Sequence, residues 1–260
     1  MKHLTSSCMI AFSTYSRIPT PRVEWNEENM RHILAFFPLV GAAVGAAFWG
    51  ADALCRLLEL GDTLRAALLT AVPAAVTGGI HLDGYCDTVD ALASHASREK
   101  KLAILKDSGA GAFAMIWCCV WFLLYFALLT ELGSIATVAA CFVLSRSFSA
   151  LGVDRLPSAR PITGPQAGMG SGLKRSSRFP RPVLAGYLTL WAGAVWLWGE
   201  PVPALAALAA AVCFYFIYKK VALRQFGGFT GDLAGWFLQI CELVMLAAAV
   251  LAERVIAVWF

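Results

Sequence analysis

The stretch Ala110–Glu131, AGAFAMIWCCVWFLLYFALLTE, carries no charge before its last residue. Its length is close to the ~20 apolar residues that an α-helix needs to cross a bilayer. The whole chain shares this character, because its 260 residues are 59% hydrophobic and only 15% charged. A soluble domain is nearer half apolar and a quarter charged. The composition therefore predicts an all-α, polytopic membrane helix bundle in the lipid bilayer, forming a single domain over residues 1–260. No nucleic-acid partner is expected at a net charge of only +4.

Apolar segments along the chain predict seven spanning helices. They cover 33–55, 63–82, 110–131, 133–153, 183–199, 202–218 and 233–252. The fifth and sixth are short and are separated by Gly199-Glu200-Pro201, so they could instead form a re-entrant pair. Residues 3–18 are mildly amphipathic and are expected at the membrane surface. The eight cysteines contain no CxxC pair and are expected to be free thiols inside helices.

Lysine and arginine orient these predicted segments. Seventeen of the 21 cationic residues fall before the first span or in alternate loops after it. They are Lys2, Arg17, Arg22, Arg31, Arg98, Lys100, Lys101, Lys106, Arg155, Arg160, Lys174, Arg175, Arg178, Arg181, Lys219, Lys220 and Arg224. Cytoplasmic loops of membrane proteins are enriched in these residues. We therefore expect a protein of the cell (inner) membrane with its N terminus and its active site on the cytoplasmic side.

The segment Gly78–Leu92, GGIHLDGYCDTVDAL, places Asp83, Asp87 and Asp90 at the spacing i, i+4 and i+7. At roughly 100° per residue they fall within about 60° of one another on a helix. Three carboxylates on one stripe repel one another unless a cation lies between them, and oxygen ligands suit Mg²⁺. We predict a catalytic magnesium site here. The alternative is a solvated helix start with Asp83 as its N-cap.

His81 precedes this stripe and falls on the other side of the same predicted helix. It is either an interfacial polar group or a substrate contact. A helix over Ser94–Lys106 is expected next, followed by Asp107 and Ser108. Small residues then open the third span, and a helix N-terminus of this kind can bind phosphate. Lys106, Asp107 and Ser108 are therefore candidate site residues, although a plain turn into the span fits equally well.

The loop 154–182 combines glycine, serine and proline with six cationic side chains. No GK[ST] follows its glycines, so it is not a P-loop. It is either a flexible linker or a mobile anion-binding lid in which Arg160 or Arg175 contacts phosphate.

The segment Phe226–Asp232, FGGFTGD, leads into the last span. Gly227, Gly228 and Gly231 allow a close backbone approach, and Thr230 or Asp232 can cap the helix. Asp232 also adds a fourth acidic group at the predicted cytoplasmic face. Two further charges, Arg146 and Glu242, fall inside predicted spans, where ionised groups are costly unless paired. We expect them to face each other across the fourth and seventh spans, and Arg146 is a candidate substrate contact.

These cytoplasmic segments, in this order, resemble the cobalamin synthase family, the adenosylcobinamide-GDP ribazoletransferases. The likeness runs from AFSTYSRIPTP at residue 11 and FFPLVGAAVG at residue 36 to the end of the chain. GGIHLDGYCDTVDAL, ASHASREKKLAILKDSGAGAFA and FGGFTGDLAGW are similar to the family's main signatures. Shorter matches are SRSF at residue 145, Pro157–Arg160 and Gly168–Gly170. The chain departs from the pattern at Ala91, Gly109 and Ser158, where the family has glycine, arginine and tyrosine.

The resemblance implies a Mg²⁺-dependent transfer. α-Ribazole, or its 5′-phosphate, attacks the cobinamide-bound phosphorus of adenosylcobinamide-GDP, GMP leaves, and adenosylcobalamin or its phosphate forms. Asp83, Asp87 and Asp90 would hold Mg²⁺ on the pyrophosphate. Asp107 or Asp232 would accept the proton of the ribazole hydroxyl, and Lys106 or a loop arginine could replace the arginine missing at Gly109. A homo-oligomer is compatible with this reading.

Two other classes of membrane protein share some of these features. A membrane phosphotransferase acting on a CDP-activated alcohol also opens with DG and later aspartates, but Asp87 and Asp90 come too soon for its pattern. A cation transporter would explain Arg146 and Glu242, but it places carboxylates near mid-membrane on broken helices. Here the aspartates gather at one predicted surface, which favours an enzyme.

Overall fold

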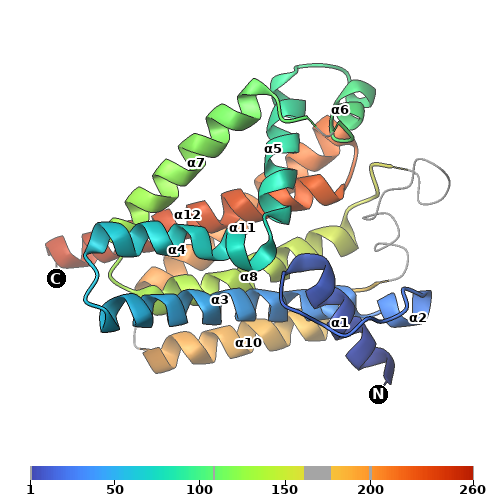
Figure 1. Cartoon of the computed structure of the whole chain (residues 1–260). Helices are drawn as coiled ribbons and strands as arrows, with labels where there is room; N and C mark the ends of the chain where they lie inside the picture. Colours follow the sequence, from blue (N-terminus) through green and yellow to red (C-terminus); the bar gives the residue numbers. More distant parts are fainter. Residues whose placement is uncertain (1, 108, 161–176, 199–200, 260) are drawn as a thin grey trace.

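The computed structural model describes residues 2–107, 109–160, 177–198 and 201–259. Over these ranges the chain is helical and contains no named strand (Figure 1). The helices are α1 (Lys2–Tyr15), α2 (Glu27–Met30), α3 (Ile33–Leu57), α4 (Asp62–Thr77), α5 (Ile80–Ala93), α6 (Arg98–Ile104), α7 (Ala112–Glu131), α8 (Ile135–Arg155), α10 (Arg181–Trp198), α11 (Pro201–Val221), the π-helical turn η1 (Ala222–Phe226) and α12 (Gly231–Trp259).

The prediction of an all-α membrane bundle is confirmed. Each of the seven expected spans coincides with a helix, namely α3, α4, α7, α8, α10, α11 and α12. Among the described residues, four helices are long and apolar enough to cross a membrane, namely α3, α7, α8 and Pro201–Phe226. The bent pair of α4 and α5 makes a fifth if it counts as one span. Seven crossings and the orientation of the N terminus stay predictions.

The second expected span, 63–82, is wrong at its C-terminal end. Helix α4 ends at Thr77, and α5 turns away from it by 94°. The cause is the glycine pair between them, since Gly78 and Gly79 have φ of 69° and 80°. Glycine adopts this left-handed conformation at little cost, so a helix commonly ends on it. The helix expected over Ser94–Lys106 is likewise shorter, because α6 begins only after the Ser97 N-cap.

Helix α8 lies at the centre of the bundle and packs against α3, α10, α11 and α12. Its contact with α3 is a contact between backbones. A Cβ atom on Gly41 would lie 2.2 Å from the Phe142 carbonyl oxygen, and one on Gly45 would lie 2.4 Å from that of Ala139. Small residues let membrane helices approach in this way, so the glycines of α3 set the distance to the central helix.

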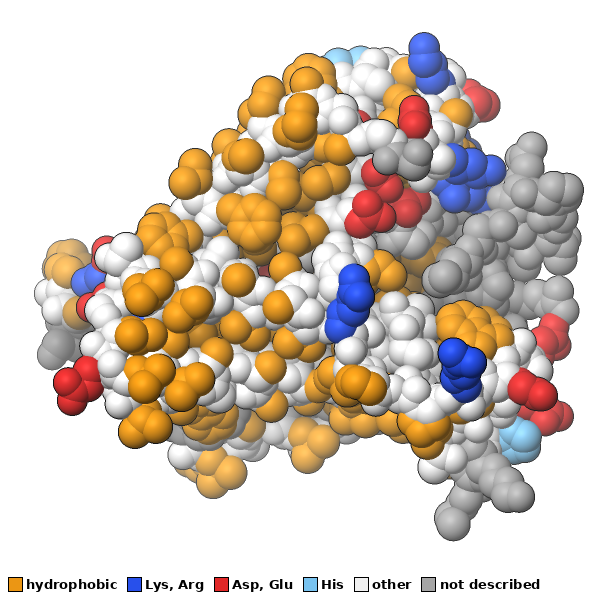
Figure 2. All heavy atoms as spheres, in the orientation of Figure 1, with side chains coloured by type: hydrophobic (Ala, Val, Ile, Leu, Met, Phe, Trp, Pro, Cys, Tyr) orange, Lys and Arg blue, Asp and Glu red, His pale blue; other side chains and the backbone are white. Residues whose placement is uncertain are grey.

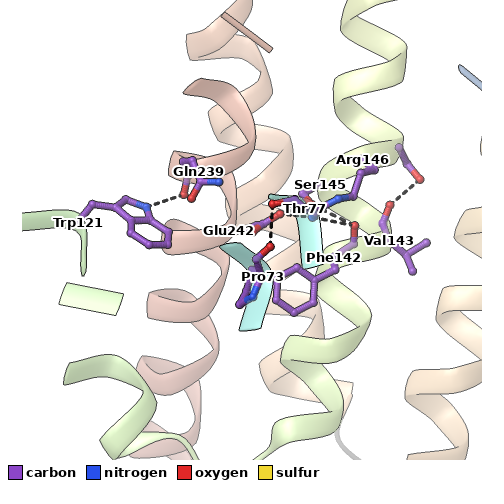
Figure 3. Close-up of polar contacts among 10 residues, drawn as sticks. Pro73, Thr77, Trp121, Phe142, Val143, Ser145, Arg146, Gln239 and Glu242 are labelled. Atoms are coloured by element: carbon purple, nitrogen blue, oxygen red, sulfur yellow. Dashed lines mark hydrogen bonds and ion pairs between the residues drawn. The ribbon is translucent and has the colours of Figure 1, made fainter. Parts of the chain in front are cut away.

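The expected ion pair between Arg146 and Glu242 is confirmed (Figure 3). The Arg146 guanidinium donates a hydrogen bond to Glu242, and Ser145 Oγ donates one to the same carboxylate at 2.9 Å. Arg146 is only 1% exposed. A buried ion pair needs such additional hydrogen bonds to offset the lost hydration of both charges. The pair therefore joins α8 to α12 inside the bundle.

The outer surfaces of the bundle are apolar. Helix α7 has the highest mean hydropathy of the candidate spans, yet most of it is not buried inside the protein. Its side chains Met115, Ile116 and Leu123 are among the exposed ones. Figure 2 shows hydrophobic side chains over much of the displayed face, mainly its left and upper parts, while most charged groups lie on its right part. Such a surface suits contact with lipid.

Candidate active site

The three aspartates of the stripe lie on α5, which stands across the direction of α3, α4 and α8 (Figure 1). The glycine pair at its start produces this orientation. Helix α5 packs between α12 and α7 at the end of the bundle that also carries α1, α2 and α6. The C terminus lies at the opposite end (Figure 1). The aspartates are therefore presented at one end of the helices rather than along a span.

Two glycines bring α5 and α12 into backbone contact. A Cβ atom on Gly84 would lie 2.8 Å from the Asp232 carbonyl oxygen and 3.0 Å from its Cα. On the other helix, a Cβ atom on Gly235 would lie 2.8 Å from the His81 carbonyl oxygen. No side chain fits at either position without a shift of the backbone. This contact places Asp232 beside the stripe of α5.

The acidic cluster consists of Asp83, Asp87, Asp90, Asp107 and Asp232, and Asp87 lies at its centre. Burial and then the negative charges of its four neighbours raise the pKa of Asp87 to about 6. Like charges that share a site oppose ionisation. Figure 2 shows acidic side chains gathered on one face with cationic ones next to them. The structure thus brings together five aspartates that lie up to 149 positions apart in the sequence.

The cluster fits a cation in its charge but not as a ready set of three ligands. Asp83 and Asp90 are seven residues apart, which is about 10 Å along a helix, whereas Mg²⁺ binds oxygens at about 2.1 Å. The Asp90 carboxylate also accepts hydrogen bonds from the backbone N–H groups of Gly111 at 2.6 Å and Ala114 at 2.9 Å. It therefore caps α7. Among the described residues, no three His, Cys, Asp or Glu side chains are grouped closely enough to hold one ion.

A short pairing of two loops brings Arg160 to the cluster. Ala159 N–H donates to the Phe229 carbonyl at 2.9 Å, and Phe229 N–H donates to that of Pro157 at 2.7 Å. The Arg160 guanidinium then lies 3.7 Å from Asp232 Oδ2. Its Nη2 also donates to the Leu102 carbonyl at 3.3 Å. Arg160 thus lies next to Asp232, while Arg175 lies outside the described residues, and contact of either arginine with phosphate stays a prediction.

The glycine-rich segment before α12 makes this loop pairing possible. Gly227 has φ of 75°, and a Cβ atom on it would lie 1.8 Å from the Arg98 guanidinium carbon. A Cβ atom on Gly228 would lie 2.2 Å from the Pro157 carbonyl oxygen. Thr230 Oγ1 accepts a hydrogen bond from Leu233 N–H at 3.2 Å. The expected close approach is present at Gly227 and Gly228 but not at Gly231, where a Cβ atom would have no neighbour within 4 Å. The expected helix cap is made by Thr230.

The other predicted site residues differ in their placement. Lys106 and Asp107 are exposed, and Asp107 Oδ1 accepts a hydrogen bond from Gly109 N–H at 3.3 Å. Ser108 lies outside the described residues. Arg146 is buried in its ion pair and does not line the cavity described next. Its expected contact with substrate stays a prediction.

A cavity of about 280 Å³ adjoins the acidic cluster. Asp83, Asp232 and Arg160 lie in its lining. The rest of the lining is mainly apolar and comes from α1, α2, α3, α5, α8 and α12, the chain between α1 and α2, and the segment before α12. The site therefore joins a charged region, suited to phosphate, to an apolar space, suited to a flat organic group.

Four residues of the site were missed by the reasoning from sequence. Gly84 comes directly after Asp83 in the motif LDG, and Gly235 comes three residues after Asp232 in the motif GDLAG. The available signal was a glycine inside a predicted helix, close to a candidate site residue. Tyr15 and Ser149 reach the cavity from helices remote in the sequence. No local pattern indicates that they share a cavity.

The fold and the site define a polytopic helical bundle with an acidic cluster and an arginine at one end. The chain belongs to the cobalamin-5-phosphate synthase family, which it matches over residues 7–250. It is therefore a transferase of cobalamin synthesis.

Three relatives illustrate this membership, and each is named adenosylcobinamide-GDP ribazoletransferase. That of Lachnoclostridium phytofermentans is 43% identical over 253 residues, with 96% of this chain and 95% of the relative covered. That of Desulfitobacterium hafniense is 34% identical, with 92% and 94% covered. One from Clostridium botulinum is 29% identical, with 96% and 99% covered. No solved structure matches the chain.

Proposed function

We propose that this chain transfers adenosylcobinamide phosphate from adenosylcobinamide-GDP to α-ribazole or α-ribazole 5′-phosphate. The ribazole 5′-hydroxyl oxygen forms a bond to the cobinamide-bound phosphorus, and the bond from that phosphorus to GMP breaks. The products are adenosylcobalamin, or its 5′-phosphate, and GMP. The names of the relatives support this choice of substrates. The observation that carries it is the gathering of four carboxylates around Asp87, with Arg160 next to Asp232.

Charge neutralisation is the first task of the site, because phosphoryl transfer depends mainly on alignment and electrostatics. Asp83 and Asp87 are the residues proposed to hold Mg²⁺, since they lie one helical turn apart. Mg²⁺ bound there would neutralise charge on the diphosphate of the donor. The raised pKa of Asp87 is in keeping with this assignment, because after burial its main causes are the negative charges of the neighbouring carboxylates. Arg160 is placed to contact a phosphate oxygen on the other side of the cluster.

Asp232 is the better of the two candidate bases. Burial raises the pKa of its carboxyl, although the Arg160 guanidinium opposes part of this effect. A raised pKa makes an aspartate a more effective proton acceptor near neutral pH. Asp232 lines the cavity, whereas Asp107 does not. Asp232 is therefore proposed to accept the proton of the ribazole hydroxyl as the new bond to phosphorus forms.

The site is proposed to face the cytoplasm from the cell membrane. Helices α1, α2, α5 and α6 lie together at one end of the bundle, away from the C terminus (Figure 1). The chain segments at this end carry much of the excess of lysine and arginine, and such segments stay in the cytoplasm. Polar substrates would then reach the cluster without crossing the bilayer.

The test is to incubate the full chain in lipid nanodiscs with adenosylcobinamide-GDP, α-ribazole and Mg²⁺. We expect GMP and a complete cobalamin in equal amounts. Asp87→Asn should abolish turnover while the protein still inserts and folds. Asp62→Asn is the matched control, because Asp62 is exposed at the start of α4 and its loss should leave the rate unchanged. Failure of the wild-type chain to form product would refute the proposal.

A further inference from the structure

Three residues that each carry a buried polar atom without a hydrogen-bond partner line the cavity. Of the seven such atoms among the described residues, three belong to residues that line this one space, namely His81 Nε2, Ser149 Oγ and Arg160 Nε. His81 is 4% exposed and Ser149 is 1% exposed. Most buried polar groups in proteins are hydrogen-bonded, since leaving one unpaired is costly. Their concentration at a single cavity indicates a ligand that carries matching polar atoms.

The side chains that line the cavity indicate what kind of ligand it can bind. The His81 ring stacks on Tyr15 with centroids 6.1 Å apart and meets the edge of Phe37 at 5.9 Å. The ring centroids of Tyr15 and Phe37 are 4.3 Å apart. Apolar side chains such as Leu34 and Leu238 complete this part of the lining. Aromatic and aliphatic surfaces with one or two polar groups are typical of sites for flat heterocycles.

We propose that this cavity binds the benzimidazole-type base of the acceptor nucleoside, an inference that rests on the function proposed above. Once one ring nitrogen carries the ribose, such a base has a single free ring nitrogen, which is a hydrogen-bond acceptor. The His81 imidazole N–H or the Ser149 hydroxyl can donate to it. Arg160, Asp83 and Asp232 lie where the cavity meets the acidic cluster, and the 5′-hydroxyl would reach them from there.

The other parts of the two substrates fit the cavity less well. A corrin ring with its side chains is several times larger than about 280 Å³. Guanine presents donors and acceptors along two edges, and burying it against an apolar wall would leave most of them unpaired. The benzimidazole base of a riboside accepts one hydrogen bond at its free ring nitrogen, and the rest of its surface is apolar. The polarity of the wall therefore selects the acceptor base.

The experiment measures α-ribazole binding to the full chain in nanodiscs by calorimetry, without the corrinoid substrate. We expect His81→Phe and Ser149→Ala to weaken binding by roughly 3–10-fold each, the size of one lost hydrogen bond. In turnover they should raise the KM for α-ribazole and leave that for adenosylcobinamide-GDP unchanged. Tyr218→Phe is the matched control, because Tyr218 also has a buried, unpartnered hydroxyl but does not line the cavity.

A change of ligand tests the same contact without altering the fold. An indole riboside has a C–H group in place of the free ring nitrogen of a benzimidazole riboside. The wild-type chain should bind it roughly 3–10-fold more weakly than the matching benzimidazole riboside, and His81→Phe should lose much of this preference. Equal binding of both ribosides by the wild-type chain would overturn the inference.

The outcomes separate this inference from the function on which it rests. Unchanged α-ribazole binding in both cavity variants, with turnover intact, overturns the cavity assignment and leaves the transferase standing. Weakened binding of GMP in place of α-ribazole also overturns it, because the cavity would then hold the donor nucleotide. Absence of GMP release and cobalamin formation in the wild-type chain refutes the transferase itself.

Discussion

The contact between α5 and α12 can be tested by adding a single methyl group. In Gly84→Ala the new Cβ atom would lie 2.8 Å from the Asp232 carbonyl oxygen and 3.0 Å from its Cα. Ordinary contacts of a Cβ atom are longer, so the two backbones must separate by several tenths of an ångström or more. Overpacking of this kind costs about 1–3 kcal/mol. The same shift moves Asp232 away from Asp83 and Asp87.

The expected effect on catalysis is larger than the effect on folding. Misplacement of catalytic groups by about 1 Å can cost roughly a hundredfold in rate. We therefore expect Gly84→Ala to lower kcat by about 10–100-fold while the chain still folds and inserts. The assay is GMP release at saturating substrates, together with the thermal unfolding temperature in nanodiscs.

Gly186→Ala is the matched control for this prediction. Gly186 lies in α10, and a Cβ atom on it would have no neighbour within 4 Å. Alanine has a higher helix propensity than glycine by about 1 kcal/mol, so this variant should be as stable as the wild type or more so. A Gly84→Ala chain with the kcat of the wild type would refute the role assigned to the α5–α12 contact.

Three further predictions follow from the same contacts. The pKa of Asp87 is about 6 without a cation, so its carboxylate gains a proton as the pH falls through 6. The Mg²⁺ concentration needed for half-maximal rate should therefore rise up to about tenfold per pH unit below that value. A constant Mg²⁺ requirement from pH 7 to pH 5 would contradict Asp87 as a ligand. Arg146→Met should destabilise the fold by about 3–5 kcal/mol, because it leaves Glu242 buried and unpaired. The variant in which both charges are reversed should have a higher free energy of unfolding than either variant with one charge reversed. Absence of this rescue would argue against the ion pair. Asp90→Ala should lower the unfolding temperature, because it removes the acceptor of two backbone hydrogen bonds at the start of α7. An unchanged unfolding temperature would show that the Asp90 carboxylate does not cap that helix.

Much of the site could be predicted from local patterns. The stripe of Asp83, Asp87 and Asp90 follows from helical spacing, and α5 is a helix over all three. Arg146 and Glu242 were expected to pair because two opposite charges inside apolar segments need each other, and they do. The same argument could not find the bend at Gly78. A pair of glycines permits a continuous helix or a sharp turn, and the packing of α5 against α12 and α7 selects the turn.

The sequence by itself determined the class of the protein and most of its helices, and it predicted the chemical type of its site. Apolar length and helical spacing are local properties, so they can be counted along the chain. The tertiary structure alone decided that Asp107, Arg160 and Asp232 meet the stripe, and that an apolar cavity opens beside them. The position of Asp232 depends on the backbone contacts at Gly84 and Gly235, and that of Arg160 on the loop pairing at Gly228. Such contacts arise only when helices far apart in the sequence pack together, because no local pattern encodes the distance between them.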